Sequence, residues 1–124
     1  MEQEYIKGDI VMYDNKIHII MDTLGVNNYE LSCVEHPVHQ LEISGTLLTL
    51  EILKKNGWKK KMYCDWCYYL PIEGNLLYLS KGTGIDGAFS AGVGQDMSHI
   101  ASISFVHQLQ HLLFGLGLNS EIEV

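Results

Sequence analysis

The sequence predicts an α+β fold, and three observations predict it. Short apolar stretches separated by turn residues fill most of the chain and are typical of antiparallel strands. One short helix is predicted at 50–55 and a longer amphipathic helix at 105–116. The length of 124 residues fits one compact domain. We therefore expect a single domain made of two parts. The first is a small β-unit over 1–47, and the second contains a helix, a β-meander and a closing helix over 48–118. A loose tail over 119–124 follows.

The predicted N-terminal unit is a small antiparallel β-barrel, SH3-like and half open. Turn signals at Asp14-Asn15-Lys16, at Gly25 and at Asn27-Asn28 divide the region into short stretches rich in β-branched and aromatic residues. The strands expected from this division are 10–13, 17–21, 29–34 and 41–43.

The central region predicts a short helix and then an antiparallel meander. Thr49 is a suitable N-cap, and Asn56-Gly57 is a typical left-handed helix stop. Glycine-rich connections then separate four predicted strands, 60–70, 76–80, 88–92 and 99–103.

The closing helix carries an apolar stripe of the width that faces a core. At 100° per residue an arc of about 120° contains Phe105, Val106, Leu109, Leu112, Leu113 and Leu116. Ser102 or Ser104 is the expected N-cap, and the helix is expected to end at Gly115 and Gly117. A second row on the opposite side holds His107, His111 and Phe114. Either the helix is sandwiched between the sheet and the N-terminal unit, which we favour, or this row contacts a partner.

Composition and charge exclude several classes of protein. Fifteen carboxylates oppose eight lysines, arginine is absent and the net charge is −7, which argues against a general nucleic-acid binder. No apolar run approaches the ~18 residues of a membrane span, and the N-terminus is acidic where a signal peptide is basic. Three cysteines without an export signal do not suggest disulfides. We expect a cytoplasmic protein that needs no cofactor.

One basic island, Lys54–Lys61, contains five of the eight lysines and surrounds Trp58. An aromatic ring among cations can stack on nucleic acid. A solvated helix C-terminus also favours lysines, because their positive charge lies beside the negative end of the helix dipole. We prefer this structural interpretation.

Cys64 and Cys67 form a CxxC pair that could be half of a zinc site, with His107 and His111 supplying the other half. The stretch around the cysteines favours a β-strand, in which residues three apart point to opposite faces. Both thiols could then reach one metal only across a bulge or turn. We expect no bound metal and keep this Cys₂His₂ set as an alternative.

Other motifs are weaker. His36 and His39 flank Pro37, and a loop pair at the surface is favoured over a ligand cluster that would also use Glu35 or His99. The glycine pattern over 82–87 satisfies GxGxxG but continues into further glycines rather than a helix, so a β-connection is favoured over a nucleotide loop. No serine lies in a GxSxG elbow and no cysteine in a known catalytic signature. We therefore expect no catalytic residues.

Two segments resemble a known group of proteins. The central segment is Leu48-Thr49-x-Glu51-x-Leu53-x-Lys55-x-Gly57-Trp58, and the closing segment is Val106-His107-Gln108-Leu109-Gln110. Their order and separation resemble an uncharacterised family of small hypothetical proteins encoded by phages and mobile elements of gut bacteria. The resemblance covers most of residues 40–116 and implies a genomic setting and a shared fold. It carries over no catalytic residues.

We therefore expect a non-enzymatic accessory or interaction protein of a prophage or mobile element, with a protein as its partner rather than nucleic acid or a membrane. The alternatives are a small zinc-binding domain using Cys64, Cys67, His107 and His111, and a nucleic-acid accessory protein using Lys54–Lys61. The candidate interaction surface consists of six residues, namely His107, His111, Phe114, Trp58, Lys59 and Lys60.

Overall fold

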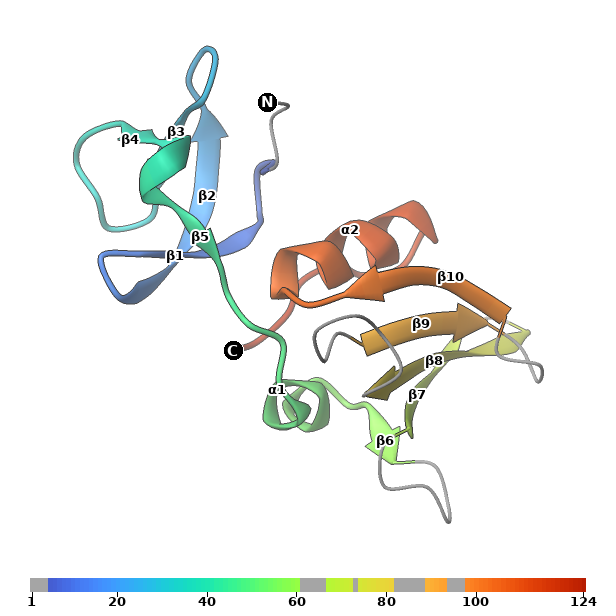
Figure 1. The fold of residues 1–124 in the computed structure, drawn as a ribbon. Coiled ribbons are helices and arrows are strands. Elements are labelled where there is room, and N and C mark those ends of the chain that lie inside the picture. The colour runs from blue at the N-terminus through green and yellow to red at the C-terminus, as the bar shows by residue number, and fades with distance from the viewer. Residues whose placement is uncertain (1–4, 61–66, 73, 82–88, 94–97) are drawn as a thin grey trace.

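The computed structural model describes residues 5–60, 67–72, 74–81, 89–93 and 98–124 (Figure 1). The fold is α+β, as predicted. Two five-stranded antiparallel sheets and two α-helices account for most of the described chain. None of the helices among these residues is long and apolar enough to cross a membrane.

The first sheet is curled into the half-open barrel that the sequence predicts. It contains β1 (Ile10–Tyr13), β2 (Lys16–Thr23), β3 (Asn28–Leu31), β4 (Val38–His39) and β5 (Ser44–Gly45), in the order β4-β3-β2-β1-β5. Asp14 and Asn15 both have positive φ (51° and 61°), which makes the tight β1–β2 turn compatible with the strand twist. A short 3₁₀-helix, Gln40–Glu42, links β4 to β5. The core of this unit includes Val11, Ile20, Tyr29, Leu31 and Val38.

The second sheet follows α1 (Leu50–Lys55), which Thr49 caps through a bond from the Ile52 N–H to its Oγ1 (3.2 Å), as predicted. Its strands are β6 (Lys59–Lys60), β7 (Cys67–Ile72), β8 (Asn75–Lys81), β9 (Phe89–Val93) and β10 (Ser98–Ile103). They pair in sequence order as a meander.

Helix α2 (Val106–Gly115) covers one face of this second sheet (Figure 1). Val106, Leu109 and Leu113 are buried in one cluster with Leu77 and Leu79 of β8. The same cluster includes Ile10 of β1, so the two units share core packing.

The ends of α2 differ from the prediction. Phe105, not a serine, is the N-cap residue, and the Oε1 atom of Gln108 accepts the N–H groups of Ser104 (2.7 Å) and Phe105 (3.0 Å). Ser102 does not cap the helix. Leu116 lies beyond the last turn and is 40% exposed, so it does not extend the core stripe.

The tail over 119–124 is not loose, which corrects the prediction. The Asn56 side chain bonds the main chain of Glu123 twice, and the Lys55 Nζ atom donates to the Val124 carbonyl (3.0 Å). Ile122 packs against the core cluster of the second sheet. The segment is therefore tied to the end of α1.

Candidate interaction site

The second face of α2 meets the N-terminal unit through Gln110, which is 5% exposed. Its Oε1 atom accepts the Ile10 N–H (2.9 Å), and its Nε2 atom donates to the carbonyls of Gly8 (2.9 Å) and Ser120 (3.2 Å). The side-chain amide thus gives β1 a donor and an acceptor, as a neighbouring strand would. Gln110 joins the N-terminal sheet, α2 and the tail.

The next residue, His111, pairs with the buried Asp9. The His111 Nε2 atom lies 3.0 Å and 2.8 Å from the two Asp9 carboxylate oxygens. Oδ2 of Asp9 also accepts the Ile6 N–H (2.9 Å), which holds the carboxylate in place. The His111 side chain keeps 37% exposure, so this contact forms the rim of the junction between α2 and β1.

His107 lies deeper in the junction and is 8% exposed. Its ring meets the edge of Tyr5 at a centroid distance of 5.0 Å and stacks on Phe105 at 5.8 Å. Burial lowers the pKa of His107 below 6.5; Asp9 partly opposes this shift and His111 adds to it. The buried Nδ1 atom has no hydrogen-bond partner among the residues that the structure describes. The neutral ring therefore acts as a packing element.

A hollow of about 350 Å³ opens beside His107, lined by Tyr5, Gly45, Phe105, His107, Gln108 and His111. Gly45 is required here, because an added Cβ would lie 2.6 Å from the Phe105 ring. Rings from the N-terminal segment and from α2 with its N-cap residue meet at this hollow, where His107 and His111 already contact the N-terminal unit.

The row His107, His111 and Phe114 is split by the structure. The two histidines contact the N-terminal unit, whereas Phe114 is 70% exposed. The helix thus lies between the second sheet and the N-terminal unit over its first two turns only. Phe114 lies with Ile6, which is 45% exposed, on the wall of a shallow hollow at the far end of the junction.

The prediction that Trp58 lies on the interaction surface is wrong. Trp58 is 5% exposed and belongs to the core of the second sheet, so it is not available for stacking on a nucleic-acid base. Lys59 and Lys60 are exposed on β6, an edge strand. Lys61 lies outside the described residues.

The structure does not bring the described members of the zinc set together. Cys67 alternates along β7 with Tyr68, which faces the α2 side of the sheet, so the Cys67 thiol lies on the opposite face from His107 and His111. There the Ser80 hydroxyl contacts its sulfur (3.6 Å). Cys64 lies outside the described residues, and within the described ones no three His, Cys, Asp or Glu side chains form a metal-binding group.

The remaining motifs have local contacts or lie outside the description. The Nδ1 atom of His39 accepts the Leu41 N–H (3.1 Å) at the start of the 3₁₀-helix, and His36 Nδ1 lies 3.1 Å from the Pro37 carbonyl. His36 is therefore an exposed loop histidine, whereas His39 is the exposed last residue of β4 and caps the 3₁₀-helix. The glycine pattern at 82–87 and the His99 side chain lie outside the described part of the chain.

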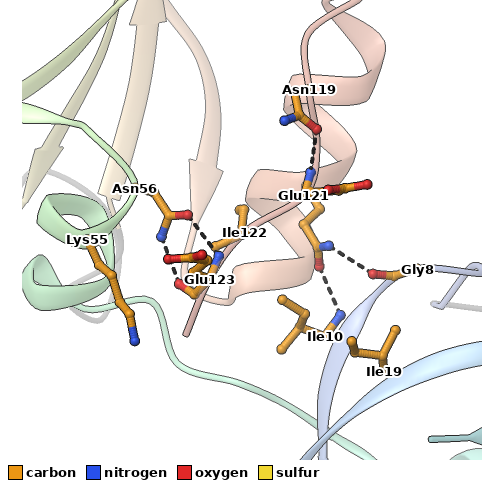
Figure 2. A pocket seen from close by; sticks show the side chains of 10 residues that line it. Gly8, Ile10, Ile19, Lys55, Asn56, Asn119, Glu121, Ile122 and Glu123 are labelled. Carbon is orange, nitrogen blue, oxygen red and sulfur yellow. Dashed lines mark hydrogen bonds between the residues drawn. The ribbon is translucent and has the colours of Figure 1, made fainter.

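One concave site was not anticipated from the sequence. A groove of about 690 Å³ lies between the outer face of β1–β2 and the tail, lined by Gly8, Ile10, Ile19, Lys55, Asn56, Gln110, Asn119, Glu121, Ile122 and Glu123 (Figure 2). On β2, Ile17, Ile19 and Met21 follow each other on this face and are 44–47% exposed. The signal was present in the sequence, because β2 carries large apolar residues at 17, 19, 20 and 21, which places apolar side chains on both faces of the strand.

No protein-family model, curated protein or solved structure matches this chain. The geometry alone therefore supports the functional argument.

Proposed function

We propose that this protein is a non-enzymatic accessory protein of a prophage or mobile element, and that it binds a segment of a partner protein on the outer face of β2. The observation that carries the proposal is the exposed apolar row Ile17, Ile19 and Met21. The genomic setting rests on the resemblance of the central and closing segments.

Both faces of β2 are apolar, but the described residues fully cover only one of them. On the inner face Ile20 is 1% exposed and belongs to the N-terminal core. On the outer face the β1–β2 register sets Ile17 opposite the half-buried Met12, which extends the row, and Ile19 opposite Ile10, which is buried. Contiguous exposed apolar surface of this kind is typical of protein interaction sites.

The charge of the surrounding unit favours a basic partner. Residues 1–47 contain eight carboxylates and only two lysines. Glu121 and Glu123 line the groove into which Ile19 faces. A segment that alternates apolar and basic residues would place its apolar side on the row and its cations near these carboxylates.

The test uses a labelled peptide of alternating lysine and valine and a counterpart with glutamate in place of lysine. Fluorescence anisotropy measures binding to the wild type and to two variants with the same charge change, Ile19→Lys and Leu41→Lys. Leu41 is 87% exposed, is not part of the row and does not line the groove.

We expect the lysine peptide to bind the wild type and Leu41→Lys alike, more weakly at high salt. Ile19→Lys should weaken the binding at least fivefold. Equal weakening in both variants, or equal binding of the glutamate peptide, would contradict the proposal.

A further inference from the structure

Residues 119–124, here called the strap, lie across the end of α1 in the manner of a bound peptide. The Asn56 Nδ2 atom donates to the Glu123 carbonyl (2.7 Å), and Asn56 Oδ1 accepts the Glu123 N–H (2.8 Å). Lys55 and Gln110 hold the carbonyls of Val124 and Ser120. Figure 2 shows Asn56 facing the Glu123 main chain.

The contact at Glu123 recognises backbone rather than a side chain. One amide satisfies both the N–H and the C=O of a single residue, which any extended residue except proline can offer. The Glu123 side chain is not part of this contact, and the residue is exposed. Selectivity comes from the preceding position, where Ile122 is half-buried against the core cluster.

Charge adds a second selective feature. Lys54, Lys55, Lys59 and Lys60 are exposed on α1 and β6. The strap brings Glu123 to this end of α1, and Glu121 lines the same groove as Lys55. The basic island thus lies beside an acidic segment of the same chain. An apolar residue between two acidic ones matches both the apolar contact and the lysines.

We propose that the end of α1 is a binding site for an extended acidic segment of a partner protein with an apolar residue at the Ile122 position, and that the strap is its built-in competitor. The bonds to Glu123 and Val124 are exposed to water, so the strap can open locally while the fold persists. Tethering gives the strap an effective concentration on the order of millimolar, which a partner must overcome. The strap lines the groove beside the β2 row, but the binding site at the end of α1 does not include the row and its test changes no residue of it, so its failure and that of the proposed function are distinguishable.

The test releases the strap without touching the core. Glu123→Pro removes the N–H that Asn56 Oδ1 accepts, whereas Glu123→Gln removes the same charge and keeps the N–H. The probe is a labelled peptide with the sequence of residues 118–124, blocked at both ends so that no terminal charge contributes. Fluorescence anisotropy measures its affinity for each full-length variant.

We expect Glu123→Pro to bind the peptide about tenfold more tightly than the wild type, since losing one hydrogen bond shifts the open population by about that factor. Glu123→Gln should bind like the wild type. A peptide with aspartate at the Ile122 position, or Asn56→Ala added to Glu123→Pro, should abolish binding. Equal affinity for Glu123→Pro and Glu123→Gln, or no binding to either, overturns the proposal.

Discussion

Replacing Gln110 with methionine tests whether this one side chain joins the two halves of the fold. Methionine has a similar length and shape but makes none of the three hydrogen bonds that Gln110 makes to Gly8, Ile10 and Ser120. The replacement leaves the buried Ile10 N–H unpaired, which costs about 1–3 kcal/mol. The Gly8 carbonyl is exposed and the Ser120 carbonyl half-buried, so these two losses cost about 0.5–1 kcal/mol each.

We therefore expect Gln110→Met to lower the free energy of unfolding by about 2–5 kcal/mol, measured by urea denaturation followed by circular dichroism. The matched control is Phe114→Ser on the same helix. Because Phe114 is 70% exposed, its replacement should change the free energy by about 0.5 kcal/mol or less. A loss below about 1 kcal/mol in Gln110→Met, or equal losses in the two variants, would refute the inference that Gln110 joins the units.

Two further variants test the junction around His107. Because burial lowers the pKa of His107, the unfolded chain binds a proton before the folded one as the pH falls below about 6.5, so the free energy of unfolding should fall on acidification. This decrease between about pH 7.5 and about pH 5.5, measured by urea titration, should be smaller in His107→Phe than in the wild type. A pH dependence unchanged in His107→Phe would contradict the assignment. Gly45→Ala should lower the free energy of unfolding by about 1–3 kcal/mol, because its methyl group would clash with Phe105. The control Gly115→Ala, whose methyl group meets no atom within 4 Å, should leave the free energy unchanged or raise it slightly. Similar thermal shifts in the two alanine variants would argue against the close approach.

Both helices and most of the longer strands could be predicted from local patterns, because turn residues and hydrophobic periodicity act over a few positions. The strand predicted at 41–43 is wrong, since the 3₁₀-helix Gln40–Glu42 lies there between the short strands β4 and β5. The paired positive φ values at Asp14 and Asn15 are what an Asp-Asn turn favours. The cap of α2 was missed for a different reason. The usual cap is a short side chain at the N-cap itself, whereas here Gln108 reaches back from the third helical position to Ser104 and Phe105.

The environment of the second row of α2, His107, His111 and Phe114, could be predicted only in part. A helical wheel gives the angular position of each side chain but not its position along the helix axis. Phe114 shares the angular face of His107 but lies about 10 Å further along the helix axis. The contacts of α2 with Tyr5 and Asp9 involve the histidines, and Phe114 is left exposed. Trp58 was misplaced because its lysine neighbours suggested the surface, although its backbone N–H bonds Leu53 and its ring enters the core.

The strap was beyond local inference. Its acidic composition is typical of a solvated tail, but its order comes from Asn56, which is 67 positions away from Glu123 in the chain. A contact of that separation leaves no periodic pattern. The same holds for Gln110, whose partner Ile10 is 100 positions away.

The closing segment Val106–Gln110, which carries the resemblance, is used almost completely by the fold. Val106 and Leu109 enter the core, His107 packs on Tyr5, Gln108 caps the helix and Gln110 completes β1. A junction between two small β-units needs polar side chains that satisfy buried backbone groups, and these residue types are constrained for that reason alone. The joint between the two units therefore accounts for the residue types of this segment in this chain. The residues free to differ in partner choice are those outside the joint, such as the β2 row and the strap.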